Sequence, residues 1–258
     1  MKTFPKTAII IPCYNEANRL DRQAFIDFIR THPDYVLCFV NDGSSDHTIS
    51  VLHEIKEAQP SQIHVLDMPK NGGKAAAVRA GALYLSESTD AELIGFIDAD
   101  LSTDFQDFKA LAQKLDGDKQ LDVVYGSRSK GECSGVDRDF LRAIFSKIVK
   151  AFVYLILRLP IEDTQCGAKV FRRSIVSIAF AVPFQTKWLF DVEIFIRLKR
   201  YYSPDNVMDH IYEQPLVKWV HVDDSKLGAK DAIQIPVRLL MIWYKYNMTA
   251  GLLEPKAG

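Results

Sequence analysis

A short apolar run that ends in two carboxylates constrains this chain more than any other feature. The residues from Leu93 to Ile97 predict a buried strand, and Asp98-Ala99-Asp100 follows directly. Because side chains alternate along a strand, Asp98 and Asp100 are expected to leave its end on the same side. Two such carboxylates can hold Mg²⁺ or Mn²⁺, completed by waters and by the phosphates of a bound nucleotide. The alternative is that they belong to a solvated turn or a helix cap.

Three further apolar runs in the first half of the chain are also followed by polar segments. The runs from Thr7 to Ile11, Tyr35 to Val40 and Ile63 to Leu66 predict buried strands. Helical spacing predicts helices from Ala17 to Arg30 and from Ala75 to Leu85. This alternation predicts an α/β fold, a mostly parallel central sheet with helices on both faces. Ligands bind such sheets at the carboxyl ends of the strands, where the polar segments fall.

Length and composition suit one enzyme-sized domain over residues 1–258. With 258 residues, 48% of them hydrophobic, the chain can bury a large core without disulfides. A formal charge of −1 gives no basic field for nucleic acid, which is not expected as a partner. The four cysteines show no metal-ligand spacing and suit a reducing compartment. The sequence shows no signal-peptide core and no apolar run of about 20 residues, which predicts a cytoplasmic location.

Six motifs occur in order along the chain: Ile-Ile-Pro-Cys-Tyr-Asn-Glu at 10–16, Val-Asn-Asp-Gly-Ser-Ser-Asp at 40–46, Asn-Gly-Gly-Lys at 71–74, Asp-Ala-Asp at 98–100, Gly-Ser-Arg at 126–128 and Asp-Thr-Gln-Cys-Gly-Ala-Lys-Val-Phe at 163–171. Together they resemble family 2 glycosyltransferases of the GT-A (Rossmann-like) fold, from about residue 5 to residue 226. Within that family the chain is most similar to the dolichyl-phosphate glucosyltransferases and the polyprenyl-phosphate mannose and glucose synthases. This narrower likeness rests on 163–171 and on Phe-Asp-Val-Glu at 190–193.

The resemblance implies a donor site in the half of the chain from about 5 to 126, closed by a later loop. The implied nucleotide-sugar-binding residues are Pro12, Tyr14, Glu16, Asp42, Lys74, Asp98, Ala99, Asp100, Trp219 and Lys226. The first three would line the nucleoside pocket, and the last two belong to the loop over the diphosphate. The implied metal ligands are the two carboxylates of the Asp-Ala-Asp motif. Position 102 is Ser, where the mannosyl-phosphate synthases keep a glutamine ligand.

Asp42 and Lys74 each have a second interpretation. A carboxylate at Asp42 could accept a hydrogen bond from the edge of the base, but the segment 41–46 also suits a turn followed by a helix cap. Lys74 follows two glycines at a helix start, where backbone amides favour a phosphate, although a solvated lysine in the first turn is the alternative. The phosphate loop of an ATPase is disfavoured, because position 68 is Met and Ala75 follows the lysine.

The half from about 127 to 258 is expected to bind the acceptor. A helix predicted from Arg138 to Leu159 is broadly apolar and bordered by basic residues, which suits either a membrane surface or an ordinary packed helix. Arg142 and Ser146 share one face of this helix, and with Arg128 they could converge on a phosphate. Polyprenyl-phosphate synthases carry a comparable arginine and serine pair, so the resemblance implies a lipid phosphate.

A phosphate acceptor would simplify the chemistry of transfer. A phosphate monoester is mostly ionised at neutral pH, so its in-line attack on the anomeric carbon, with inversion, needs no catalytic base. The two residues given catalytic roles are Asp100, as a metal ligand, and Asp191. Asp191 lies where hydroxyl-acceptor relatives keep a base, and we expect it to orient the sugar or an arginine, with a helix cap as the alternative.

The expected function is therefore transfer of a hexose, with glucose from UDP-glucose favoured, to a polyprenyl or dolichyl phosphate. The expected partners are the nucleotide sugar, the lipid phosphate and the cytoplasmic face of a membrane; a homo-oligomer stays open. The alternative functions are transfer to a hydroxyl of a soluble or cell-surface glycan, mannosyl transfer from GDP-mannose, and a non-catalytic sugar-nucleotide-binding module. Donors that carry GlcNAc or a deoxysugar also stay open.

Overall fold

One mixed β-sheet runs through the molecule in the computed structural model, which describes residues 4–128, 150–217 and 229–248. The described strands follow the order β3-β2-β1-β4-β6-β5-β7 across the sheet. All neighbours pair in parallel except β6, which runs antiparallel to β4 and β5. The strand bounds are β1 Thr7–Cys13, β2 Tyr35–Asn41, β3 Ile63–Asp67, β4 Leu93–Phe96, β5 Val123–Ser127, β6 Lys169–Arg172 and β7 Ile211–Pro215.

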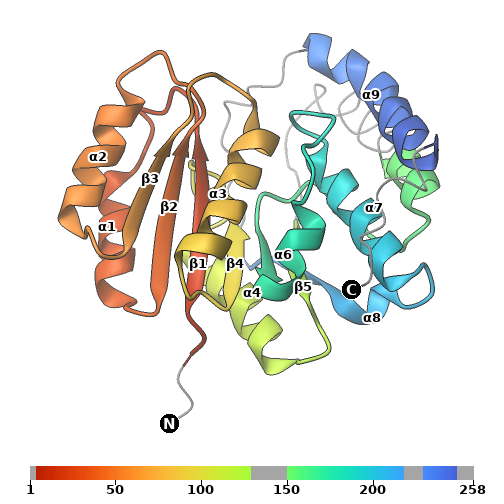
Figure 1. Cartoon of the computed structure of the whole chain (residues 1–258), viewed down its shortest axis with the longest axis horizontal. Coiled ribbons are helices and arrows are strands. Elements are labelled where there is room, and N and C mark those ends of the chain that lie inside the picture. The colour runs from red at the N-terminus through yellow and green to blue at the C-terminus, as the bar shows by residue number, and fades with distance from the viewer. Residues whose placement is uncertain (1–3, 129–149, 218–228, 249–258) are drawn as a thin grey trace.

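Helices cover both faces of the sheet (Figure 1). The described helices are α1 Arg22–Thr31, α2 Thr48–Ala58, α3 Lys74–Ser88, α4 Phe105–Gly117, α6 Arg173–Ala179, α7 Phe190–Tyr202, α8 Val207–His210 and α9 Ala229–Met248, and residues 150–157 are also helical. The hydrophobic core divides into two clusters, one on each side of the sheet. Helices α1, α2 and α4 contribute to one cluster, and α3, α6, α7 and α9 to the other. The predicted fold class is thus confirmed.

Alternation along β1 and β2 explains why both strands read as continuous apolar runs. Ile9 and Ile11 of β1 belong to the cluster beneath α1 and α2, whereas Ala8 and Ile10 belong to the cluster beneath α3. Parallel strands covered on both faces bury both sets of side chains, so the run is apolar throughout. The strands predicted in this region are confirmed, and each extends by one or two residues beyond the predicted end.

Two element boundaries differ from the predictions for local reasons. Helix α1 begins at Arg22 rather than at Ala17, because the Asp21 carboxylate accepts from the amide of Ala24 and caps the helix there. Strand β4 ends at Phe96, so Asp98 and Asp100 do not leave the strand itself. They lie in the turn that follows, where the amide of Leu101 donates to the carbonyl of Asp98.

The basic, apolar helix predicted from Arg138 to Leu159 is described only at its end. Residues 150–157 are helical, while Arg142 and Ser146 lie outside the described residues, as do Trp219 and Lys226. The helix stops before Arg158, which has a positive φ of 50°. Within the ranges that the structure describes, no helix is both long enough and apolar enough to cross a membrane.

Candidate active site

A cavity of about 460 Å³ opens at the carboxyl ends of β1, β2 and β4. All eight described residues that were predicted to bind a nucleotide sugar line it: Pro12, Tyr14, Glu16, Asp42, Lys74, Asp98, Ala99 and Asp100. The parallel pairing of β1 with β2 and with β4 brings these segments to one edge of the sheet, although up to 88 positions separate them in the sequence.

The loop after β1 is held by the loop after β2. Asn15 adopts a positive φ of 52°, its amide donates to the Ser44 hydroxyl at 3.0 Å, and its side-chain oxygen accepts from the amide of Ser45 at 2.9 Å. The amide of Glu16 donates to the Thr48 hydroxyl at 2.8 Å. These bonds fix the segment that carries Tyr14, whose ring stays 37% exposed beside the cavity.

Asp42 does not cap the helix that follows it. Helix α2 begins at Thr48, and the carboxylate nearest its start is that of Asp46, which accepts from the amide of Thr48 at 3.0 Å. The buried Asp42 carboxylate instead accepts from the amides of Gly72 and Gly73 at 2.7 and 2.8 Å. Burial raises the pKa of Asp42, although these amides and the charge of Lys187 act against the rise. Asp42 therefore shapes the loop at 71–73 in addition to lining the cavity.

Lys74 begins α3 and forms an ion pair with Asp98 inside the cavity. Burial acts to lower the pKa of Lys74, but the charges of Asp98 and Asp191 outweigh it, and the pKa is raised. Lys74 is thus a protonated lysine at the N-terminus of α3, stabilised by nearby carboxylates. It is not the solvated first-turn lysine of the alternative interpretation, because its side chain is only 17% exposed.

Asp98 rests against the backbone of the 163–171 motif. A Cβ atom added at Gly167 would lie 2.1 Å from Oδ2 of Asp98, so a glycine is required for this close approach. Asp100 is exposed, and one of its carboxylate oxygens accepts from the amide of Ser102 at 2.9 Å. The two carboxylates of the Asp-Ala-Asp motif therefore differ: the first is packed and ion-paired, and the second faces solvent.

The two carboxylates fit a hard divalent cation whose remaining ligands come from outside the protein. Both line the cavity, and carboxylate oxygens are what Mg²⁺ and Mn²⁺ prefer. Among the described residues no group of three or more His, Cys, Asp or Glu side chains could hold a metal. The donor set that fits is accordingly two carboxylates together with diphosphate oxygens and waters, the arrangement usual for Mg²⁺.

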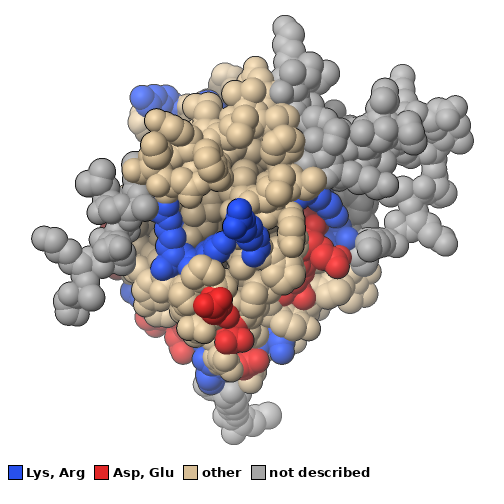
Figure 2. Space-filling view, turned by 90° about the vertical axis from the view of Figure 1, so that its right-hand side faces the viewer, with Lys and Arg blue, Asp and Glu red and all other residues tan. Residues whose placement is uncertain are grey.

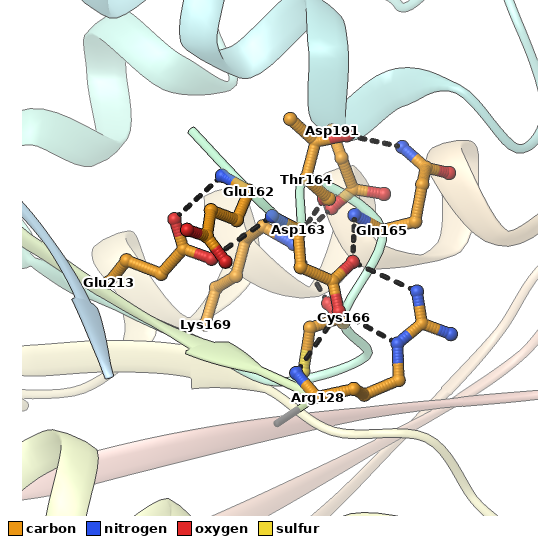
Figure 3. A network of polar contacts seen from close by, with 9 residues as sticks. All are labelled: Arg128, Glu162, Asp163, Thr164, Gln165, Cys166, Lys169, Asp191 and Glu213. Atoms are coloured by element: carbon orange, nitrogen blue, oxygen red, sulfur yellow. Dashed lines mark hydrogen bonds and ion pairs between the residues drawn. The ribbon is translucent and has the colours of Figure 1, made fainter. Parts of the chain in front are cut away.

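Asp191 lies in the first turn of α7; it is buried and does not line the cavity, and Figure 3 draws it together with Lys169. Its carboxylate forms an ion pair of 2.6 Å with Lys169, a lysine that is fully buried. Lys169 also donates to the carbonyls of Thr164 and Cys166 at 3.0 and 2.8 Å. Burial raises the pKa of Asp191, and the two neighbouring lysines oppose the rise. Asp191 thus pairs with a lysine rather than with an arginine, and no side chain caps α7; its predicted role in orienting the sugar stays a prediction.

Arg128 makes a two-pronged ion pair with Asp163 (Figure 3). Its Nε and one terminal nitrogen donate to the two carboxylate oxygens at 2.7 and 2.8 Å, and its backbone amide donates to the same carboxylate at 3.1 Å. Glu213 holds the other side of this loop by accepting from the amides of Glu162 and Asp163. Asp163 thus orients the Arg128 guanidinium, and the Arg128 side chain is 40% exposed; its contact with a phosphate stays a prediction.

Some residues that line the cavity were not among the predicted site residues. They are Cys13, Arg19, Asn71, Gly73, Lys187 and Trp188. Lys187 and Trp188 lie just before α7, and their nearest signal in the sequence is the Phe-Asp-Val-Glu motif that opens this helix. Asn71 and Gly73 belong to a motif that sequence analysis did identify, although it assigned the contact to Lys74 alone.

The fold and the cavity define the class of protein. The structure resembles solved structures of glucosyl-3-phosphoglycerate synthase from Mycobacterium tuberculosis, one with uridine-diphosphate and another with Mn²⁺, uridine-diphosphate and phosphoglyceric acid. The first gives a TM-score of 0.66 at 18% identity and covers 93% of this chain and 80% of that chain. The second gives 0.66 at 19% identity and covers 93% and 78%. The chain therefore has the GT-A glycosyltransferase fold.

The sequence comparison then gives the family. Residues 8–178 match the model described as glycosyl transferase family 2, and the chain belongs to this family of glycosyltransferases. It is 31% identical to a dolichyl-phosphate beta-glucosyltransferase of Trichomonas vaginalis over 93% of this chain and 74% of that protein. It is 32% identical to the dolichyl-phosphate beta-glucosyltransferase of Drosophila melanogaster, over 94% and 76%. The human protein of that name is 28% identical over 96% and 78%.

Asp163→Asn tests the Arg128 ion pair through its pH dependence. Burial acts to raise the pKa of Asp163, but hydrogen bonds and charge from Arg128 outweigh it and the pKa is lowered. A lowered folded-state pKa gives stability that is present above the unfolded value of about 4 and is lost as the pH falls through the folded value. The variant should unfold in urea with about 1.5–3 kcal/mol less stability at pH 7. This difference from the wild type should narrow below about pH 4.

Asp90→Asn is the matched control, because Asp90 pairs with Lys6 at the solvent-exposed surface. Exposed pairs contribute little, so this variant should follow the wild type at both pH values. If the difference in unfolding stability between Asp163→Asn and the wild type stays constant from pH 7 to below pH 4, the lowered pKa assigned to Asp163 is wrong.

Proposed function

We propose that this glycosyltransferase transfers glucose from UDP-glucose to dolichyl phosphate or another polyprenyl phosphate, with inversion at the anomeric carbon. The proposal is supported by relatives named as dolichyl-phosphate beta-glucosyltransferases that match more than nine-tenths of this chain. It is also supported by a cavity that combines carboxylates, a lysine and an aromatic ring at the carboxyl ends of the strands. In this proposal the half from about 5 to 126 supplies most of the donor site, with Lys187 and Trp188 added from the other half, which binds the acceptor.

The donor roles follow the layout of the cavity. Pro12, Tyr14 and Glu16 surround the nucleoside, and Asp42 accepts from the base edge with the acceptor capacity that the loop at 71–73 leaves to its carboxylate. Lys74 contacts the diphosphate. To do so, the lysine exchanges its Asp98 partner for phosphate oxygens. Ala99 lines the wall between the two carboxylates of its motif. The remaining proposed contacts, Trp219 and Lys226, lie outside the described residues.

Asp98 and Asp100 would hold Mg²⁺ or Mn²⁺ beside the diphosphate. Such a cation would supply electrostatic stabilisation of the negative charge that develops on the leaving nucleoside diphosphate. Protein groups would also orient the diphosphate, since Lys74 and the glycine-rich loop before α3 line the same cavity. Asp100 is the more accessible of the two carboxylates, and we assign it the larger part in catalysis.

The observation that carries the choice of acceptor is the burial of Asp191. A general base must come within hydrogen-bond reach of the proton that it removes. Asp191 is 4% exposed, is ion-paired with Lys169 and does not line the cavity. It is therefore poorly placed to activate a hydroxyl, the acceptor of the rival function. A phosphate acceptor, already ionised at neutral pH, has no need of such a base. Asp191 acts instead by supporting Lys74 and the loop that Lys169 holds.

The acceptor phosphate would meet Arg128, with Arg142 and Ser146 as further contacts outside the described residues. Because Nε and one terminal nitrogen of Arg128 already donate to Asp163, a phosphate would meet this guanidinium at its other terminal nitrogen. Arg128 directly follows β5, which runs parallel to β4, so it lies at the same edge of the sheet as the donor cavity.

A lipid acceptor requires contact with a membrane, and α9 together with residues 150–157 offers a suitable surface. Most of the large apolar side chains that the described residues expose lie there: Tyr154, Leu155, Val237, Leu240, Met241, Trp243, Tyr244 and Met248. Figure 2 faces the side of the molecule that carries α9, and its upper part is largely uncharged. Arg158, Arg238 and Lys245 border this surface, which suits anionic lipid at the cytoplasmic face.

The transfer assay tests the proposal directly. Purified protein, labelled UDP-glucose, Mn²⁺ and a short-chain polyprenyl phosphate should give a product that extracts into organic solvent. Asp100→Asn should abolish the product while leaving the melting temperature unchanged, because it removes charge at an exposed site and creates no cavity. A chelator should have the same effect on the wild type, and restored Mn²⁺ should reverse it.

Product formation on a soluble glycan that depends on Asp191, with none on the lipid phosphate, would overturn the proposal in favour of a hydroxyl acceptor. Preference for GDP-mannose in a panel of donors would replace glucose by mannose. Full turnover in the presence of the chelator would remove the metal from the account.

Vesicle binding tests the proposed membrane surface. The double substitution Leu240→Glu/Met241→Glu places two charges on the exposed face of α9 and keeps residues that favour a helix. It should weaken co-sedimentation with phosphatidylcholine and phosphatidylserine vesicles about tenfold, the equivalent of about 1.4 kcal/mol. The control, Tyr201→Glu/Tyr212→Glu, adds the same charge at exposed residues of α7 and β7. An equal loss of vesicle binding in both double variants would show that added charge alone causes the effect. It would contradict the proposal that α9 forms the membrane surface.

A further inference from the structure

A buried carboxylate lies behind one wall of the donor cavity. Glu193 of α7 is fully buried, and its two oxygens accept from the amide of Gln185 at 2.9 and 3.0 Å. One of these oxygens also accepts from the amide and the hydroxyl of Thr186, at 3.2 and 3.3 Å. The next two residues, Lys187 and Trp188, line the cavity. Glu193 thus sets the course of the backbone that leads into this wall.

The same segment is fixed at its other end by the start of α3. The amide of Ala75 donates to the carbonyl of Lys187 at 3.1 Å, and the Lys187 ammonium donates to the side-chain oxygen of Asn71 at 3.3 Å. The methylenes of Lys187 pack against Gly73, where an added Cβ would lie 2.6 Å from the lysine Cβ. Lys187 therefore contacts the loop at 71–73, which Asp42 also holds through the amide of Gly73.

A residue of the C-terminal helix completes the support of Glu193. Tyr246 of α9 is 3% exposed, and its hydroxyl donates to Glu193 at 3.0 Å. The Nε of Arg197 donates to the same hydroxyl at 2.9 Å, so both the donor and the acceptor capacity of the phenol are used. Burial raises the pKa of Tyr246 to about 12, so the hydroxyl keeps its proton at neutral pH. Arg197 is itself anchored on the carbonyl of Ala179 at 2.8 Å.

These contacts form a continuous path from α9 to the cavity. It runs from the Tyr246 hydroxyl to Glu193, on to the amides of Gln185 and Thr186, and ends at the two lining residues that follow. Tyr246 and Glu193 do not line the cavity themselves. Any effect that they have on a bound donor must therefore pass through the segment 185–188.

We infer that Glu193 and Tyr246 are positioning residues of the donor site, which hold the segment 185–188 so that Lys187 and Trp188 present a cation and an aromatic ring to the bound nucleotide sugar. The inference rests on the proposed function, because it assumes that the cavity takes a nucleotide sugar. It makes α9, whose Tyr246 bonds to Glu193 and Arg197 of α7, a part of the donor site. Loss of either residue should weaken donor binding more than it slows turnover at saturating donor.

The substitution Tyr246→Phe removes the hydroxyl and keeps the packed ring. Calorimetric titration with UDP-glucose and Mn²⁺ should show a dissociation constant about tenfold higher than that of the wild type, because part of the donor's interaction free energy then goes into ordering the segment 185–188. The matched control is Tyr201→Phe on α7, the helix that carries Glu193; this residue is 52% exposed, and the variant should bind as the wild type does. Glu193→Gln loses one acceptor oxygen and the charge, and should weaken binding in the same way if Tyr246→Phe does not fold.

A double-mutant cycle separates positioning from a general loss of stability. Lys187→Ala alone should weaken donor binding, and Tyr246→Phe should cause a smaller loss in that variant than in the wild type, because the part of its effect that passes through Lys187 is already gone. Additive losses, or wild-type affinity in Tyr246→Phe and Glu193→Gln, would overturn the inference and leave the proposed function standing. Failure of the wild type to bind any nucleotide sugar would overturn both.

Discussion

The parallel pairing of β1 with β2 and β4 is the constraint on which the site depends. Register places Cys13 opposite Asn41 and Ile10 opposite Phe96, so the loops that leave these three strands meet at one edge. None of these loops forms the cavity alone. The hydrogen bonds from the amides of Gly72 and Gly73 to Asp42 join the end of β2 to the start of α3, and thereby turn a row of strand ends into a walled cavity. Asp42, which the sequence analysis predicted only as a ligand contact or part of a turn and cap, therefore also holds the cavity wall together.

Charge at this edge is balanced by paired side chains. Lys74 pairs with Asp98, Lys169 with Asp191, and Arg128 with Asp163. Burying ions costs free energy, and such pairs contribute little net stability compared with apolar packing. Their benefit is preorganisation: donors and acceptors are already oriented before a charged ligand arrives, so little reorganisation is needed during reaction. Asp100 is exposed and makes no ion pair among the described residues, and it is one of the two carboxylates, with Asp98, that we propose as metal ligands.

The sequence predicted the local parts of this arrangement and missed those that depend on tertiary contacts. Apolar runs identified β1, β2 and β3, because a parallel strand covered on both faces must be apolar throughout. Tyr14, Asp42 and Lys74, which the resemblance named, line the cavity because each lies in a motif that follows a strand, while their binding roles stay predictions. The resemblance gave no sign that β6 would run antiparallel between β4 and β5, because strand order is not written in periodicity.

The contribution of Lys187 and Trp188 also escaped prediction for a physical reason. They lie between α6 and α7 in a segment without regular structure, and they reach the cavity only because Glu193 and the start of α3 hold that segment from both ends. The pairing of Arg128 with Asp163 spans 35 positions and has no local signature either. The predicted roles of Arg142, Ser146, Trp219 and Lys226 lie outside the described residues and stay predictions.

The central claim is that the cavity at the ends of β1, β2 and β4 binds a nucleoside diphosphate and a divalent cation together. A crystal structure with UDP and Mn²⁺, with anomalous data collected at the manganese edge, tests it most directly. The account predicts UDP in the cavity between Tyr14 and Lys74, with an anomalous peak beside Asp98 and Asp100. UDP bound elsewhere, or bound in the cavity with manganese away from both carboxylates, would contradict the account.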